Sequence, residues 1–201
     1  HIPKAQNCCG ALHVHAGRKD DARALARNNI DATLGGDYDV ILTNAAGCGS
    51  TLKEYDELLE HDEAYREKSL AFKAKMKDIS EFLGSIELRV PEKPLAMTVT
   101  YQDSCHLCHG QKIRSQPRKV LAAIPGVVLK EMALSDLCCG SAGIYNVQHN
   151  EMAMGLLKNK MQAVNATGAE CIVTANPGCM IQLQAGARLH GKEQAVLHVV
   201  E

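Results

Sequence analysis

The stretch Asp136-Leu-Cys-Cys-Gly-Ser-Ala-Gly143 places two adjacent cysteines directly before a glycine. Neighbouring side chains on an extended strand point to opposite faces, so Cys138 and Cys139 can address one object only if the backbone turns there. Gly140 allows that turn, because a residue without a Cβ accepts positive φ. The stretch therefore predicts a tight loop that directs two sulfur atoms at one site. The same tripeptide occurs near the start of the chain, at Cys8-Cys-Gly10.

The two Cys-Cys-Gly tripeptides belong to a longer internal repeat. Each is followed by a helical pattern, a short apolar run and the pattern Thr-x-x-x-Gly-Cys, at Thr43–Cys48 and Thr174–Cys179. Cys9 precedes the last cysteine of its pattern by 39 positions, and Cys139 precedes its counterpart by 40. Such self-similarity indicates two duplicated units.

Strand and helix patterns alternate along the chain, which predicts an α/β fold. We expect two similar units, each a small, mostly parallel sheet with flanking helices and with cysteines at the C-terminal edges of the strands. The proline-rich segment 91–94 is the expected boundary, which gives domains at residues 1–90 and 91–201. The expected strands are 38–43, 95–101, 126–132, 169–174 and 195–200, and the expected helices are 20–31, 51–59, 72–83, 117–124, 149–165 and 179–190.

The first unit looks truncated at its N-terminus. The chain begins with histidine rather than methionine, and no strand precedes Cys8 as one precedes Cys105 in the second unit. We therefore expect the chain to be part of a longer one, with the opening strand and first cysteine of the first unit upstream.

Composition excludes several classes of function. The net charge is −1 and no basic block occurs, so the chain lacks the cluster of lysine and arginine residues that is typical of a nucleic-acid-binding protein. No apolar run approaches the roughly 18 residues of a transmembrane span, and no signal peptide is visible. The nine cysteines are an odd, clustered set, unlike the even set of a secreted disulfide scaffold. These features favour a cytoplasmic protein whose thiols bind metal or carry out redox chemistry.

The motif cysteines fall where ligands bind in α/β proteins, at the carboxyl ends of strands. In the second unit these are Cys105, Cys138, Cys139 and Cys179; in the first unit they are Cys8, Cys9 and Cys48. Cys48 and Cys179 lie near predicted helix N-termini, where the helix dipole favours a thiolate. We expect each set to meet at one edge of its sheet.

Four thiolates suit either zinc or an iron–sulfur cluster. Structural zinc sites usually contain two close cysteine pairs, and ferredoxins contain a run of closely spaced cysteines. Neither spacing occurs here, because the motif cysteines are dispersed over long stretches. A cluster with dispersed ligands fits the spacing better.

The chain resembles the C-terminal part of the iron–sulfur subunit family of glycolate oxidase. That family has two cysteine-rich CCG domains, which also occur in lactate-utilisation protein A and in heterodisulfide reductase. The resemblance covers essentially the whole chain. Its carriers are Cys8-Cys-Gly-Ala-Leu-His-Val-His15, Ala26-Arg-Asn-Asn-Ile-Asp31, Asn44-Ala-Ala-Gly-Cys-Gly49, Lys53-Glu-Tyr55, Asp103-Ser-Cys-His106, Leu137-Cys-Cys-Gly-Ser-Ala-Gly-Ile-Tyr145 and Thr174-Ala-Asn-Pro-Gly-Cys179.

The resemblance implies an electron-transfer subunit of a glycolate dehydrogenase (oxidase) complex, not catalytic alone. It implies FAD-containing subunits as partners and an upstream ferredoxin-like domain with two [4Fe–4S] clusters. A [4Fe–4S] cluster is expected on the four thiols of the second unit. The first unit holds an incomplete set, with zinc as the alternative ion there. A cytoplasmic location follows, with peripheral association with the membrane through the complex left open.

Two other functions stay open at this point: a heterodisulfide-reductase-like catalytic module, and a structural zinc protein or scaffold. The wider family ends its motif in Cys-x-x-Cys, whereas Gln182 and Thr51 stand three residues after the last cysteines of the two patterns here. That departure counts against cleavage of a substrate disulfide.

Further cysteines and histidines lie beside these motifs. Cys108 is either a spare ligand or a bystander, and Cys171 is expected to be a small buried side chain inside a strand. The histidines fit either hydrogen-bond donors to the site, with His13 or His15 as an occasional ligand that completes the first set, or polar loop residues. They are His13, His15, His106 and His109.

Overall fold

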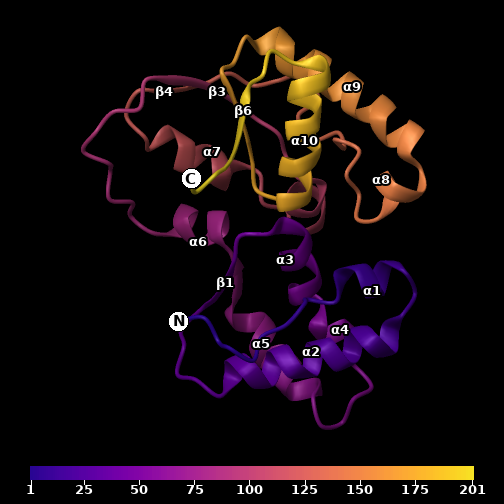
Figure 1. Cartoon of the computed structure of the whole chain (residues 1–201). Helices are drawn as coiled ribbons and strands as arrows, with labels where there is room; N and C mark the ends of the chain where they lie inside the picture. Colours follow the sequence, from indigo (N-terminus) through magenta and orange to yellow (C-terminus); the bar gives the residue numbers. More distant parts are fainter. The chain divides into compact units, whose positions relative to one another are not determined.

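The computed structural model describes the whole chain, His1–Glu201, which divides into two compact units, His1–Ile79 and Ser80–Glu201. Both units combine parallel strands with helices (Figure 1), which confirms the predicted α/β class. The division lies before the proline-rich segment 91–94, and the domain boundary after residue 90 stays a prediction.

The first unit contains a two-stranded parallel sheet and several helices. Strand β1 (Ile41–Thr43) pairs with β2 (Met76–Asp78), with Ile41 opposite Met76 and Thr43 opposite Asp78. The helices are α1 (Ala11–His15), α2 (Lys19–Leu34), α3 (Ala46–Lys53), α4 (Tyr55–Leu58) and α5 (Arg66–Lys75).

Helix α2 supplies one wall of the core of the first unit. Its side chains Ala26 and Ile30 are fully buried, as are Tyr55 at the start of α4 and Phe72 on α5. The rings of Tyr55 and Phe72 stack with their centroids 5.3 Å apart. Asp20 and Asp21 lie in the first turn of α2, where the helix dipole favours acidic side chains.

The predicted continuous helix at 72–83 is wrong. Helix α5 ends at Lys75, the backbone becomes extended at Met76, and strand β2 separates it from α6 (Ile79–Ser85). Met76 and Asp78 are buried in pairing with β1, so a distant strand decides the conformation of these residues. The internal repeat contained the signal for β2, because the second unit was predicted to end in a strand at the corresponding place.

The second unit contains a four-stranded parallel sheet in the order β4–β3–β5–β6. Its strands are β3 (Met97–Tyr101), β4 (Val127–Leu129), β5 (Cys171–Thr174) and β6 (Ala195–His198), shorter than the predicted segments but at the predicted places. Its further elements are the π-helical turn η1 (His106–Gly110) and the helices α7 (Ser115–Ala122), α8 (Tyr145–Gln148), α9 (Asn150–Thr167) and α10 (Pro177–His190).

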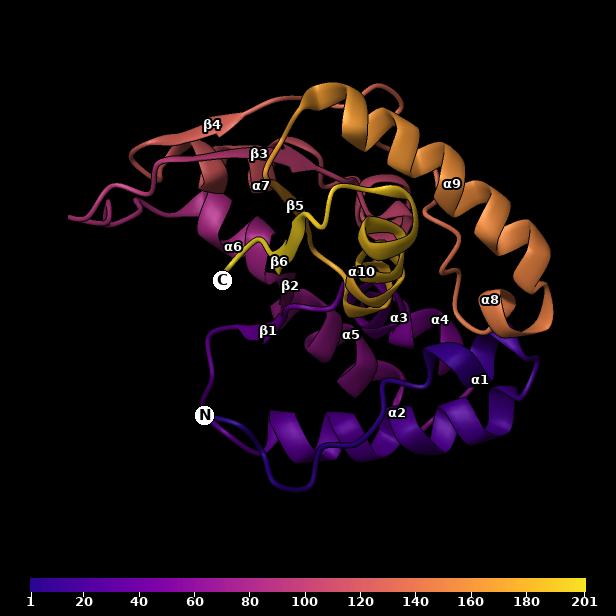
Figure 2. The same ribbon diagram turned by 45° about the horizontal axis from the view of Figure 1, so that its top comes forward.

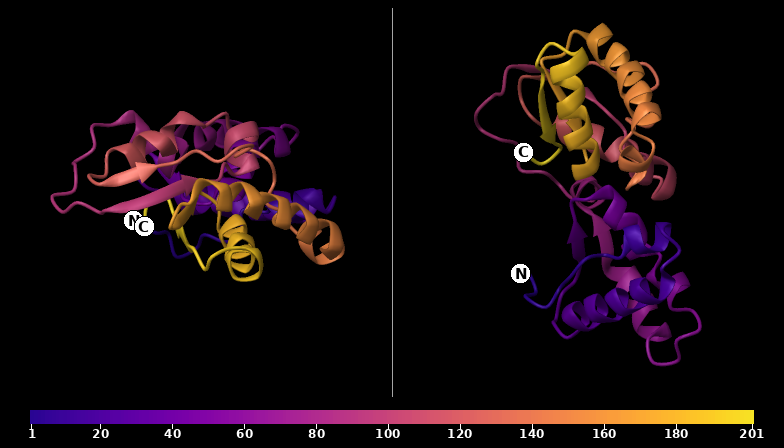
Figure 3. Two further views of the ribbon diagram at one scale, coloured as in Figure 1. Left: turned by 90° about the horizontal axis from the view of Figure 1, so that it is seen from above. Right: turned by 45° about the vertical axis from the view of Figure 1, so that its right-hand side comes forward.

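Helices cover both faces of this sheet. Helix α7 lies on one face, and α9 and α10 lie on the other (Figure 3). Strand β5 runs beside β6 and leads into α10 (Figure 2). The core between sheet and helices contains Leu157, Met161, Ile172 and Leu183, all fully buried.

None of the helices in the chain combines the length and the apolar character needed to cross a bilayer.

Candidate metal centre

The ends of β3 and β5 are tied together by buried polar residues. Gln102 donates its backbone N–H to the carbonyl of Val173 at 2.9 Å, and the Thr174 hydroxyl lies 3.1 Å from the Gln102 carbonyl. The hydroxyls of Ser104 and Thr174 are 3.2 Å apart. These contacts fix the segment that carries Cys105 against the strand that leads to Cys179.

The Cys-Cys-Gly loop of the second unit turns at Gly140, as the sequence predicts. Gly140 has φ +94°, and its backbone N–H donates to the sulfur of Cys138 at 3.3 Å. A Cβ at this position would lie 2.3 Å from the carbonyl oxygen of Ala153 on α9, so only glycine fits. The loop is thus pressed against the helix that follows it.

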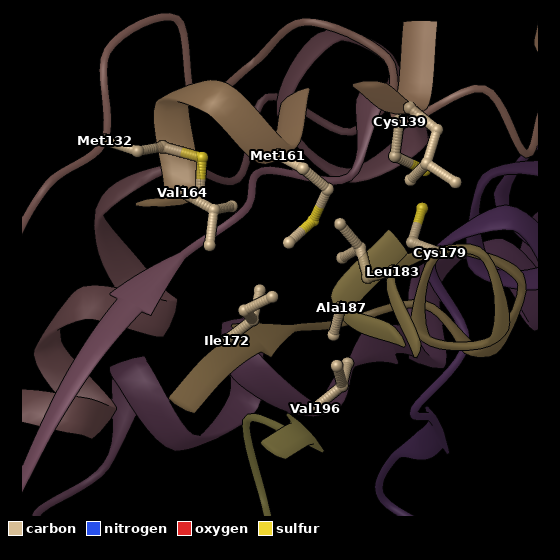
Figure 4. Packing of buried hydrophobic residues seen from close by; sticks show 10 residues of the cluster. Met132, Cys139, Met161, Val164, Ile172, Cys179, Leu183, Ala187 and Val196 are labelled. Carbon is tan, nitrogen blue, oxygen red and sulfur yellow. The ribbon is translucent and has the colours of Figure 1, made fainter. Parts of the chain in front are cut away.

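The four thiols of the second unit converge. Hydrogen bonds join Cys105 to Cys138, Cys138 to Cys139, and Cys139 to Cys179. Figure 4 shows Cys139 and Cys179 next to each other at one end of the hydrophobic cluster. Three segments that are distant in sequence therefore direct their sulfur atoms at one place.

The hydrogen bonds between these thiols lower the pKa of some of them and raise the pKa of others. Hydrogen bonds from Cys105 and Cys139 lower the pKa of Cys138, with a further contribution from the N–H of Gly140. The pKa of Cys105 is raised by the same hydrogen bond with Cys138 and by burial. The set therefore favours a mixture of thiol and thiolate, and thiolate is the form that binds metal.

Cys179 lies in the first turn of α10. Its pKa is lowered mainly by the hydrogen bond with Cys139 and also by the side chains of Asn176 and Ser104. The amide Nδ2 of Asn176 lies 3.5 Å from the Cys179 sulfur. Gly178 leaves room for the neighbouring loop, because a Cβ there would lie 2.9 Å from the Ser141 hydroxyl.

The donor set of the second unit fits an iron–sulfur cluster. It consists of four sulfur atoms, and cysteine thiolates are the usual ligands of such clusters. Cys139 and Cys179 are buried, whereas Cys105 and Cys138 are half-buried. No group of three or more histidine, cysteine or carboxylate side chains is arranged to hold a single metal ion.

The first unit also brings its three motif cysteines together. A hydrogen bond from Cys9 lowers the pKa of Cys48 to about 7 from 9.0, and the pKa of Cys9 is raised by the same bond and by burial. Cys8 is exposed and accepts a hydrogen bond from the N–H of Gly10 at 3.5 Å. Gly10 has φ +84°, so this loop turns as its counterpart does.

A buried network that the sequence did not reveal holds the first loop. The Tyr55 hydroxyl donates to the carbonyl of Cys9 at 2.9 Å, and the amide of Asn29 donates to the carbonyl of Cys8 at 3.0 Å and to Tyr55 Oη at 3.0 Å. Asn29 also accepts the backbone N–H of Asn7 at 2.9 Å.

Around the second site, three charged residues form a network behind Cys105. Arg118 makes a two-pronged ion pair with the buried carboxylate of Asp103, at 2.8 and 2.9 Å, and also pairs with Glu131. Ser135 donates to Asp103 at 2.7 Å. Arg118 is therefore engaged within the unit, with both Asp103 and Glu131.

The remaining cysteines occupy different surroundings. Cys108 lies buried on η1, and burial raises its pKa. Cys171 is buried within β5, as expected, and burial raises its pKa to about 11. Cys171 is thus a buried cysteine of the sheet and not a member of the group of four thiols.

The histidines differ in their surroundings: two have a ring nitrogen that is buried or near a cysteine sulfur, and one lies in a network on the surface. His106 Nδ1 lies 3.7 Å from the Cys105 sulfur, and the half-buried His13 has a buried Nδ1 without a hydrogen-bond partner. His109, by contrast, contacts Arg114 at 3.1 Å and the carbonyl of Asp136 at 3.3 Å on the exposed surface.

Comparison with protein families gives a match to the cysteine-rich domain called CCG, at residues 1–53 and 99–184. The two matched ranges contain both Cys-Cys-Gly loops and both patterns that end in Gly-Cys.

Individual relatives carry names that refer to iron–sulfur proteins and to hydroxy acids. The chain is 48% identical to the probable glycolate oxidase iron–sulfur subunit of Bacillus subtilis, over 97% of this chain and 45% of that protein. It is 36% identical to the glycolate oxidase iron–sulfur subunit of Escherichia coli, over 90% of this chain and 45% of that protein. It is 27% identical to lactate utilization protein A of Oceanobacillus iheyensis, over the whole of this chain and 82% of that protein. The chain thus spans less than half the length of the two glycolate oxidase subunits.

Proposed function

Because the chain belongs to the family of cysteine-rich CCG-domain proteins, we propose that it is an electron-transfer part of an iron–sulfur subunit in a complex that oxidises glycolate or a related 2-hydroxy acid. The observation that carries the proposal is the convergence of four thiols from three segments of the second unit. The names of the relatives support an iron–sulfur cluster as the group bound there.

The proposed ligands of a [4Fe–4S] cluster are Cys105, Cys138, Cys139 and Cys179. When bound, such a cluster supplies electron transfer at a potential set by its surroundings. The chain contributes N–H donors to the ligand sulfurs, from Gly140 and Asn176. Such hydrogen bonds favour the charged form of each ligand.

Water reaches the two sides of the site unequally. Cys139 is 1% exposed and packs in the hydrophobic cluster with Leu183, which excludes water from that side. Cys105 and Cys138 are half-buried, so they form the side nearest to solvent. We infer that electrons enter or leave by that side.

In the first unit, the proposed ligands are Cys8, Cys9 and Cys48, one thiol short of a four-thiol set. A second cluster there needs a further ligand, and the alternative of a zinc ion is disfavoured, because these side chains are not arranged around a single ion. His13 is the candidate fourth ligand, because its buried Nδ1 has no hydrogen-bond partner.

The proposed partners are FAD-containing subunits, which accept the electron pair from the hydroxy acid and pass electrons on singly. We infer that the chain is not catalytic alone and that a ferredoxin-like domain lies upstream in the full-length protein. The proposed location is cytoplasmic, with peripheral association with the membrane through the complex.

Metal and sulfide analysis of the anaerobically purified full-length protein, with EPR, tests the proposal. Cys139→Ala should remove one cluster's worth of iron and sulfide together with its EPR signal. Cys171→Ala is the matched control, because it deletes a buried thiol outside the set and should leave both unchanged. Equal iron and sulfide in the wild type and in Cys139→Ala would overturn the ligand assignment, and zinc without sulfide would favour the structural alternative.

A role in cleaving a substrate disulfide is disfavoured by the side chains at the two key positions. Gln182 and Thr51 are both buried and offer no thiol where the wider family carries its last cysteine. Turnover of a disulfide substrate by the purified protein would reverse this preference.

A further inference from the structure

The two Cys-Cys-Gly loops rest on their helices in the same way. A Cβ on Gly10 would contact Ala22 of α2, and a Cβ on Gly140 would meet Ala153 of α9. The contacts therefore define equivalent positions on the two helices. Seven residues after these alanines stand Asn29 in the first unit and Lys160 in the second.

Both residues at this equivalent position are buried and hold the backbone around the cysteines. Asn29 does so through neutral hydrogen bonds to the carbonyl of Cys8 and to Tyr55. Lys160 is 4% exposed, and its ammonium group donates to the carbonyls of Leu134 at 2.8 Å and Ser135 at 3.1 Å. The position is thus uncharged in one unit and bears a buried cation in the other.

Lys160 forms no ion pair with a carboxylate; its ammonium group donates to the two backbone carbonyls alone. The nearby carboxylates are engaged elsewhere, Asp103 with Arg118 and Asp136 with Arg114. Burial lowers the pKa of Lys160, and negative charge on Cys139, Asp136, Asp103 and Cys138 opposes that lowering, with Cys139 contributing most. A buried cation is costly unless negative charge compensates it, and a thiolate set provides that charge.

We propose that Lys160 is a positioning residue that offsets the negative charge of the centre on Cys105, Cys138, Cys139 and Cys179 and thereby raises its reduction potential. This inference rests on the proposed function. Each electron added to a thiolate-ligated centre makes it more negative, so a fixed buried cation stabilises the reduced state more than the oxidised state. The neutral Asn29 gives the first unit no such effect.

The test is a redox titration of the full-length protein followed by EPR, with two variants that separate charge from hydrogen bonding. Lys160→Gln retains N–H donors for the two carbonyls and removes the charge. Its centre should have a lower midpoint potential, with an equilibrium shifted about tenfold toward the oxidised form, or about 59 mV for a one-electron couple. Lys160→Arg keeps the charge and should restore most of the shift.

An exposed lysine on the same helix provides the matched control. Lys158→Gln makes the same substitution in solvent and should leave the potential unchanged. If Lys160→Gln fails to hold the centre, Lys160→Asn supplies the neutral side chain that the first unit uses at this position.

Two results overturn the inference: a neutral variant that retains its iron and the wild-type potential, or an arginine variant shifted as far as the glutamine variant. Absence of iron and sulfide from the wild-type protein is a different outcome, because it overturns the proposed function itself.

Discussion

The thiol of Cys139 is hydrogen-bonded to the thiol of Cys179, which lies 40 positions further along the chain. Cys139 precedes a tight turn that rests on α9, and Cys179 lies in the first turn of α10. The contact between these sulfurs therefore reports whether the loop, the two helices and the sheet are all in place.

The turn at Gly140 should tolerate no side chain. Gly140→Ala forces a Cβ to 2.3 Å from the Ala153 carbonyl oxygen at φ +94°. We expect a loss of at least about 2 kcal/mol in the free energy of unfolding, measured by denaturant titration of the metal-free protein. Gly155→Ala is the control: it lies on α9, the helix of Ala153, where an added Cβ has no atom within 4 Å. It should raise the free energy of unfolding by about 0.5–1 kcal/mol. Equal stability of the two variants would contradict this role of the turn.

Loss of one hydroxyl should loosen the first loop. Tyr55→Phe leaves the Cys9 carbonyl without its donor and removes an acceptor of the Asn29 amide. The expected cost is about 1–2 kcal/mol in the free energy of unfolding. Tyr38→Phe serves as the control, because no hydrogen bond of its hydroxyl is part of this network. A cost no larger than that of the control would show that the loop is held in another way.

Ionisation of Cys48 should depend on its partner thiol. In the metal-free protein its pKa is about 7, against an ordinary value of 9.0. The ionised thiol therefore stabilises the fold above about pH 9, and this contribution is lost as the pH falls through about 7.

Difference ultraviolet spectra between the wild type and Cys48→Ser follow this thiolate directly. Cys9→Ala removes the donor and should move the Cys48 midpoint up toward 9.0, whereas Cys171→Ala should not. A midpoint that stays near 7 in the Cys9 variant would identify a different cause of the low pKa.

The buried amide of Gln182 should matter only when the site is loaded. Its Nε2 lies beside the Cys-Cys-Gly loop and has no hydrogen-bond partner. Gln182→Leu removes an unsatisfied donor, so the metal-free protein should gain about 1 kcal/mol in the free energy of unfolding. If the amide donates to ligand sulfur in the loaded protein, the same variant should lose iron faster under chelator. Unchanged iron release would exclude that contact.

The order of the four strands of the second unit and the turn at Gly140 could be predicted because they depend on local signals. Apolar runs next to glycine and asparagine define β5, and the tripeptide itself requires positive φ. The convergence of the cysteines followed from the rule that parallel strands present their carboxyl ends at one edge.

Strand β2 and the buried Lys160 could not be predicted from local signals. Met76, Lys77 and Asp78 continue a helical pattern, and only pairing with β1 makes them extended. In the sequence Lys160 resembles Lys158, the solvent-exposed lysine of the same helix α9, but the loop before Cys138 covers it. Burial that comes from a distant segment leaves no periodic trace in the sequence.

The separation of the ligand segments has a consequence for how the centre is assembled. The unfolded chain offers at most two of the four proposed ligand thiols near any one place, because Cys105, Cys138 and Cys179 are more than 30 positions apart. A group held by all four thiols therefore has affinity for the native chain alone, and its whole binding free energy adds to the stability of the fold. Loading must follow folding, and the lifetime of the loaded centre sets a lower limit on the lifetime of the folded unit.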